Sequence, residues 1–201
     1  MGQSKGNADG IGVVEIGHNG GQTMGQTPEI RDNCETLVKP SRSGLRGLVL
    51  GIDPGTNCGW ALLDWDGRRV ASGVWDLSPR RHEGGGMRFL RFQKYLEQKT
   101  TPEHPIDAIA YEEVRRHRGT SAAHIYGGIV AVLSGMAEQH AIPYKGIAVG
   151  TIKKHATGRG NANKDYMIRS ARETFGMSSL TSDDEADALF CAKTLIYELG
   201  G

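Results

Sequence analysis

Three short apolar segments separated by turn residues open the folded part of the chain, and helical and strand patterns alternate after them. The first segment ends in Asp-Pro-Gly-Thr, which predicts a buried strand that leads into a turn. Asp66 and Gly67 lie between the other two and suit a two-residue hairpin. This order predicts an α/β fold, a mixed five-stranded sheet of three antiparallel strands and then two more, covered by helices. The predicted strands span residues 45–52, 60–64, 69–75, 106–111 and 143–149, and the predicted helices span residues 83–98, 121–140, 162–175 and 183–199.

The first forty-four residues have a different composition. Residues 1–44 contain no Phe, Trp or Tyr, and they hold nine of the 29 glycines. Without large apolar side chains, this segment cannot offset the entropy cost of ordering its backbone. We therefore expect a disordered, Gly-rich N-terminal tail over residues 1–44, in which residues 11–16 have a weak strand pattern, and one folded domain over residues 45–201.

Composition excludes several classes of protein. Three cysteines without repeating spacing argue against a disulfide scaffold or a zinc site and fit a reducing compartment. The sequence shows no apolar run of about 18 residues and no charged-then-apolar leader, so we expect a cytoplasmic protein without a membrane partner.

Charge is segregated along the chain although the net charge is only +1. Residues 78–94 carry five Lys or Arg against one Glu, residues 151–172 carry six against one Asp, and residues 173–201 carry six carboxylates against one Lys. Basic residues beside Gly-rich loops can follow a phosphate backbone. The alternative interpretation of each basic segment is a solvated helix face.

Several acidic residues follow strands or lie on an otherwise apolar helix. Asp53 comes directly after the first strand, where it either initiates a turn or displays a carboxylate to a ligand at the sheet edge. Glu112 and Glu113 follow the strand at 106–111, and strand alternation allows only one of them to face a shared site. Glu113 has a structural alternative, an ion pair with Arg116 or Arg118.

The last helix carries two more candidates. Ser182 and Glu185 fit a capping box, which explains the neighbouring acids by the helix dipole but leaves Asp187 without a structural role. Asp184 and Asp187 are three residues apart and share one helix face. Together with Asp53 and one of Glu112 and Glu113 they would form an all-oxygen site that suits Mg²⁺, with Mn²⁺ as a substitute and two ions per site.

These residues resemble the RuvC-type Holliday-junction resolvases, which have a ribonuclease-H-like fold. Leu50-Gly-Ile-Asp-Pro-Gly-Thr56 resembles the first motif of that family, Ala110-Tyr-Glu-Glu-Val114 the second, and Asp184-Glu-Ala-Asp-Ala-Leu189 the last. The resemblance implies that Asp53, Glu112, Asp184 and Asp187 hold the metal ions and are catalytic, together with Lys164, which with Lys153 contacts phosphates near the scissile bond. It also implies a homodimer that cuts a four-way DNA junction to give 5′-phosphate and 3′-hydroxyl ends. The sequence leaves open whether a branch-migration helicase is a further partner.

One motif departs from the family pattern. Three residues after the second-motif Glu the family often has an aromatic side chain, whereas this chain has Arg115, followed by Arg116, His117 and Arg118. Arginine stacks on bases and also contacts phosphate. The DNA-binding set predicted from the sequence is Lys153, Lys154, Lys164, Arg115, Arg116, Arg118 and Arg159.

Other functions remain open at this stage. Within enzymes, the alternative is a broader branched-DNA or flap nuclease of the same fold, such as a phage-type relative, or one that acts on RNA. A non-catalytic junction-binding protein is the alternative from another class, although such a protein would not need all four carboxylates. Asp53-Pro-Gly-Thr56 also resembles the phosphate loop of actin-like ATPases, but those proteins pair two such domains.

Overall fold

A computed structural model describes residues 47–102, 104–115 and 119–200, so the predicted tail over residues 1–44 and the weak strand pattern at 11–16 lie outside the described residues. The sheet has the order β3-β2-β1-β4-β5, with β2 antiparallel to β1 and β3, and β4 parallel to β1 and β5. The mixed five-stranded sheet predicted from the sequence is therefore confirmed. The strands are β1 (Leu48–Asp53), β2 (Asn57–Leu63), β3 (Arg69–Asp76), β4 (Ile106–Glu113) and β5 (Tyr144–Ala148), and the helices are α1 (Met87–Lys99), α2 (Thr120–Gln139), α3 (Val149–Thr157), α4 (Lys164–Phe175) and α5 (Asp183–Glu198).

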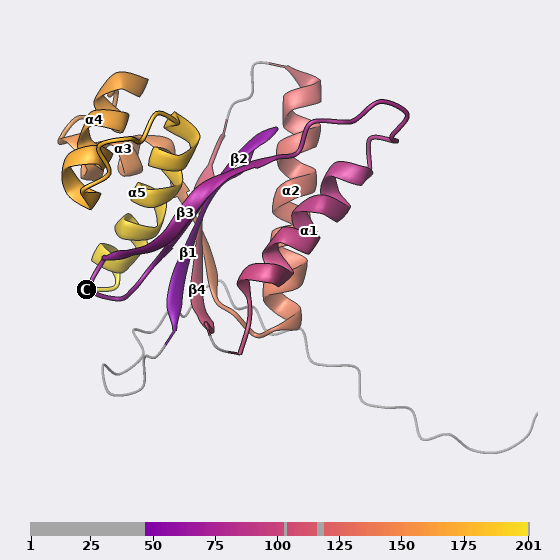
Figure 1. Cartoon of the computed structure of the whole chain (residues 1–201), viewed down its shortest axis with the longest axis horizontal. Helices are drawn as coiled ribbons and strands as arrows, with labels where there is room; N and C mark the ends of the chain where they lie inside the picture. The colour runs from indigo at the N-terminus through magenta and orange to yellow at the C-terminus, as the bar shows by residue number, and fades with distance from the viewer. Residues whose placement is uncertain (1–46, 103, 116–118, 201) are drawn as a thin grey trace, which may run out of the picture. The chain divides into compact units, whose positions relative to one another are not determined.

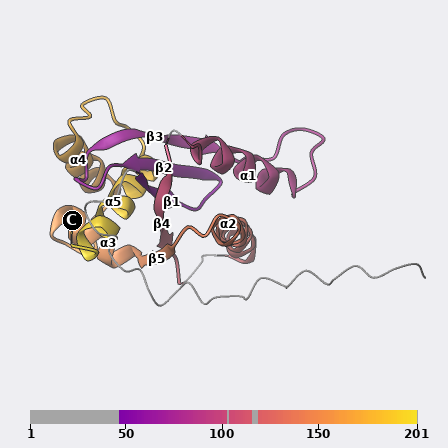
Figure 2. The same cartoon turned by 90° about the horizontal axis from the view of Figure 1, so that it is seen from below.

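Helices cover both faces of the sheet. Figures 1 and 2 show α3, α4 and α5 on one face and α1 and α2 on the other. The first face forms a core around Val49, Ala110 and Leu189, and the second forms a core around Ile52, Phe92 and Leu133. Burial on both faces explains why β1 is a continuous apolar run that does not alternate with polar residues.

Aromatic side chains fix α1 against the antiparallel half of the sheet. The rings of Trp60 and Trp75 stack with centroids 5.5 Å apart, and Trp75 also meets Phe92 edge-on at 5.9 Å. Aromatic pairs in these geometries add to the free energy gained from burial alone. Trp75 is thus a core residue.

Two details differ from the sequence-based expectation. The turn between β2 and β3 is longer than two residues, because Asp64 N donates to Arg68 O at 3.0 Å and Gly67 N donates to Asp64 O at 2.9 Å. Gly67 has φ +77°, so the loop is a turn followed by a left-handed glycine, the usual three-residue hairpin connection. The helix α3 was not predicted at all.

The helix α2 contradicts the expectation that no segment approaches a membrane span. By length and composition alone it qualifies as able to cross a membrane, because an 18-residue stretch of its 20 residues has a mean hydropathy of 1.2. Its inner face, with Ile129, Leu133 and Met136, packs in the core beside the sheet. Only 22% of this 18-residue stretch is buried, so much of the helix lies at the surface of the described chain.

Candidate active site

Two carboxylates reach the same edge of the sheet from neighbouring strands. Asp53 is the last residue of β1, and the parallel register that pairs Ile52 with Tyr111 places Asp53 beside Glu112 of β4. Alternate residues before them, such as Val49 and Ala110, belong to the core beneath α5. Because side chains alternate along a strand, Asp53 and Glu112 point toward α5.

The helix α5 lies against the sheet with almost no side chain between the two backbones. A Cβ at Gly59 of β2 would overlap the carbonyl group of Asp184, and one at Gly51 of β1 would overlap the carbonyl oxygen of Ala188. Glycine at both positions therefore lets the first turns of α5 reach the strands. This contact brings Asp184 and Asp187 toward Asp53 and Glu112.

A side-chain cap begins α5. Ser182 Oγ accepts from Glu185 N at 3.2 Å, which is the first half of the predicted capping box. The second half differs, because the Glu185 carboxylate accepts from Ser72 Oγ of β3 at 2.5 Å, and Arg69 Nε donates to the same hydroxyl at 2.5 Å. The start of the helix is thus fastened to the sheet edge through a side chain as well as through the glycine contacts.

Burial raises the pKa of every carboxyl in this cluster, and the charges of neighbouring acids raise it further. The pKa of Asp53 lies well above its ordinary value, first because of burial and then because of the charges of Glu112 and Asp187. Burial, followed by the charge of Glu112, raises the pKa of Asp187 to about 7. Burial also raises the pKa of Glu112 and of Asp184. Four acids in one low-dielectric region favour protons or cations.

The donor set fits a hard divalent cation. Asp187 Oδ1 is buried and has no hydrogen-bond partner, so it has an unused lone pair inside the cluster. Within residues 47–102, 104–115 and 119–200, however, no three Asp, Glu, His or Cys side chains are already arranged as a metal-binding cluster. The four carboxylates therefore share one region of the described chain without forming a closed cage.

The two lysines predicted from the sequence lie at this cluster in different ways. The positive charge of Lys153 on α3 lowers the pKa of Glu112 and of Asp187, against the effect of burial. Lys164, the first residue of α4, forms an ion pair with Asp183, which raises the pKa of the Lys164 ammonium. The sequence analysis had explained Asp183 by the helix dipole alone; the structure adds that it orients Lys164.

The remaining predicted DNA-binding residues are exposed or lie outside the described residues. Arg115 is exposed and pairs with Glu113 at 3.3 Å, so Glu113 does have a structural partner, although not Arg116 or Arg118. Lys154 and Arg159 are exposed near the end of α3. Residues 116–118, which include Arg116 and Arg118, lie outside the described residues.

A residue that the sequence analysis missed fixes the end of β4. The Tyr126 hydroxyl on α2 donates to Glu112 O at 3.1 Å and accepts from Val114 N at 3.2 Å. These bonds hold the backbone on both sides of Glu113 against α2. No sequence signal marked Tyr126, because an aromatic residue on an apolar helix reads as core.

Comparison with known proteins gives a consistent result. The family model described as crossover junction endodeoxyribonuclease RuvC matches residues 49–194. The RuvC nuclease of Anaeromyxobacter sp. (strain Fw109-5) is 34% identical over 149 residues, which are 72% of this chain and 70% of that protein. The RuvC nuclease of Anaeromyxobacter sp. (strain K) is 33% identical over 152 residues, which are 72% of this chain and 78% of that protein.

A solved structure supports the fold. The T. thermophilus RuvC in complex with a Holliday junction substrate superposes with a TM-score of 0.64 and 23% identity, over 76% of this chain and 94% of that one. At that identity the similarity establishes the ribonuclease-H-like architecture, which the family resemblance had implied.

Proposed function

Because this chain belongs to the RuvC family of crossover junction endodeoxyribonucleases, we propose that it resolves four-way DNA junctions by metal-dependent hydrolysis of two opposed strands. The observation that carries this proposal is the cluster itself. Asp53, Glu112, Asp184 and Asp187 come from two strand ends and one helix, raise one another's pKa values and include an unpartnered buried oxygen.

Each side chain has a distinct part in the proposed reaction. The four carboxylates would hold two divalent cations, Mg²⁺ or Mn²⁺, through oxygen atoms. When bound, such ions lower the pKa of the attacking water and stabilise the departing 3′ oxygen. Lys153, whose charge acts on Glu112 and Asp187, and Lys164, which pairs with Asp183, would contact phosphates near the scissile bond. The products would carry 5′-phosphate and 3′-hydroxyl ends.

Paired cuts require two active sites, and α2 offers a surface for a second copy of the chain. Gly127, Ala131 and Gly135 are exposed and recur every four residues, so they lie along one line of the helix. A Cβ at Gly127 or Gly135 would meet no atom within 4 Å. Small side chains on an apolar, poorly buried helix permit close approach by a symmetric partner.

The test compares three labelled DNAs in Mg²⁺: a four-way junction, a flap and a linear duplex. Paired, symmetric nicks that ligase can seal, found only in the junction, are expected. Cutting of the flap as well as the junction would support the broader branched-DNA nuclease, with Arg115 as the first residue to replace. Tight junction binding without cutting in Mg²⁺ or Mn²⁺ would favour the non-catalytic binder.

A further inference from the structure

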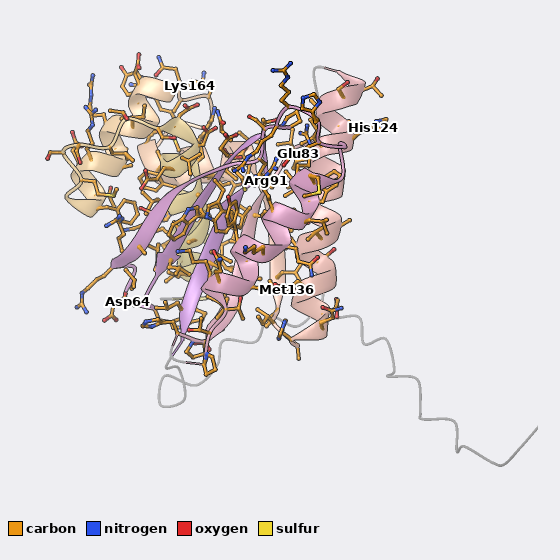
Figure 3. All side chains as sticks on the ribbon, turned by 45° about the vertical axis from the view of Figure 1, so that its right-hand side comes forward. Asp64, Glu83, Arg91, His124, Met136 and Lys164 are labelled. Atoms are coloured by element: carbon orange, nitrogen blue, oxygen red, sulfur yellow. The ribbon has the colours of Figure 1, made fainter. Side chains whose placement is uncertain are left out.

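The loop between β3 and α1 leaves the sheet at the same edge as the carboxylate cluster. Both β1 and β3 are antiparallel to β2, so their C-terminal ends lie at one edge. Leu77 N, directly after β3, donates to Thr56 O at 2.8 Å in the turn that follows Asp53. Figure 3 shows Glu83 and Arg91 toward the same end of the molecule as Lys164, and Asp64 of the hairpin toward the opposite end.

A nearly buried ion pair supports this loop from within. Arg91 of α1 donates to Glu83 Oε2 at 2.6 Å and to Ser78 O at 2.5 Å, and the two charged side chains are only 12% and 21% exposed. Glu83 Oε2 also accepts from Arg80 N at 2.9 Å, and Glu83 N donates to Arg80 O at 3.1 Å. The Arg91 guanidinium thus ties both ends of the 78–83 turn to α1.

The same turn presents unpaired cations to solvent. Arg80, Arg81 and His82 are all exposed, and His82 has φ +68°, a left-handed conformation that reverses the backbone direction. Neither arginine forms an ion pair with any described residue. The carboxylates nearest in the chain, Asp76 and Glu83, already accept hydrogen bonds from Ser78 N and Arg80 N.

From this arrangement, we propose that the β3–α1 loop, residues 78–86, binds the sugar–phosphate backbone of DNA beyond the scissile strand, with Arg80 and Arg81 as the contacting residues. The Arg91–Glu83 ion pair holds the loop in its binding conformation before DNA arrives, which lowers the entropy cost of binding. The inference rests on the proposed nuclease function and adds a contact that is separate from Lys153 and Lys164.

The chain contains a control arginine for the test. Arg68 is also exposed, but it belongs to the hairpin at the opposite edge of the sheet and pairs with Asp66 at 3.0 Å. Affinity for the junction and for linear duplex is measured in EDTA, so that no strand is cut, over a series of NaCl concentrations. The R80A/R81A variant is expected to bind both DNAs about tenfold or more weakly, with a salt slope shallower by about 2, because two phosphate contacts are lost. The R68A variant is expected to bind as wild type does.

A second variant separates loop support from simple charge. Glu83→Gln removes a negative charge beside the arginines, so electrostatics alone would tighten DNA binding. The proposal expects the opposite, a several-fold weaker affinity, because Arg91 loses its ionic partner and the loop loses its fixed conformation.

The outcomes of these measurements distinguish the loop proposal from the proposed nuclease function. Unchanged affinity and salt slope in R80A/R81A, with normal junction binding by the wild type, would overturn the loop proposal and leave the nuclease function intact. A wild type that binds DNA through Arg80 and Arg81 but cuts no junction would contradict the function and keep the loop. A wild type that binds neither DNA would overturn both, and tighter binding by Glu83→Gln would overturn the supporting role of the ion pair.

Discussion

At the level of single residues, Asp187 connects the chemistry of the site to the stability of the fold. Its pKa is about 7 in the folded chain, raised first by burial and then by the charge of Glu112, whereas an unfolded Asp titrates near about 3.9. Below about pH 4 the Asp187 carboxyl is protonated in both the folded and the unfolded chain. Between that pH and 7 the folded state binds more protons, so the stability contributed by this group falls as pH rises and is lost above pH 7.

Asp187→Asn is therefore expected to abolish cleavage and to stabilise the metal-free protein at pH 8. The gain in free energy of unfolding should be on the order of 2–4 kcal/mol, because each unit of pKa shift corresponds to about 1.4 kcal/mol and Asp187 is partly accessible to solvent. The difference from wild type should shrink toward pH 4. Urea denaturation at both pH values and a junction-cleavage assay measure the two effects.

The control is Glu173→Gln, which removes an exposed carboxylate on α4. Its stability should stay within about 0.5 kcal/mol of wild type at both pH values. Two results would refute the role given to this carboxyl. One is cleavage by Asp187→Asn at the wild-type rate, and the other is an unfolding free energy whose pH dependence is the same in Asp187→Asn and in wild type.

Residue-level prediction from the sequence succeeded where a motif marked the position. Asp53, Glu112, Asp184 and Asp187 were proposed from their places after strands and on a helix face, and the structure brings them together. Their catalytic and metal-binding roles stay predictions. Asp183 was underrated and Tyr126 was missed, because their roles arise from contacts between elements distant in sequence, namely with Lys164 and with the backbone of Glu112.

At the level of elements, the contact between α5 and β2 depends on Gly59. Gly59→Ala would place a Cβ against the carbonyl group of Asp184, and a backbone group cannot rotate away as a side chain does. Overpacking of this kind costs about 1–3 kcal/mol, and α5 would shift outward with both of its acids. We expect reduced stability in urea denaturation and a loss of cleavage far larger than the loss of folded protein.

Gly150→Ala in α3 provides the matched control, because a Cβ there would meet its nearest atom, Gly160 O, at 3.9 Å, an ordinary contact. Replacing glycine by alanine within a helix should stabilise the protein by up to about 1 kcal/mol and leave cleavage unchanged. Equal behaviour of the two variants would show that the close approach at Gly59 does not position α5.

Most elements followed from the pattern of the sequence, and the exception has a physical reason. The helix α3 begins at Val149 directly after β5, without a side-chain cap, and contains Val, Gly, Thr and Ile in its first turn. These residues have low helix propensity. The helix also buries only one of its described residues, Ile152, and a single buried residue cannot show the repeating apolar spacing by which a helix is recognised in a sequence. Its helical state comes from packing beside α4 and α5, which sequence patterns do not reveal.

At the level of the whole molecule, the proposed dimer makes α2 a functional surface. Ala131→Glu puts a charge in the middle of the exposed line of small residues, and an unpaired charge buried between two copies is costly. We expect a monomer by sedimentation velocity, with unchanged thermal stability of the monomeric fold and loss of paired, symmetric nicks.

Gln98→Glu, which adds the same charge at an exposed position of α1, serves as the control and should stay dimeric. A dimer that survives Ala131→Glu would move the proposed interface away from α2. A wild type that is monomeric at assay concentrations would contradict the paired-cut mechanism itself.

The contact between α5 and the sheet also determines how mutational surveys of this protein should be designed. Gly51 and Gly59 contribute to the arrangement of the acids by having no side chain, so a survey that only truncates side chains has nothing to remove at these positions. Their importance becomes visible only in a library that enlarges residues. A map of sensitive positions made by truncation would therefore mark the four acids and leave unmarked the two glycines that let α5 bring two of them to the sheet.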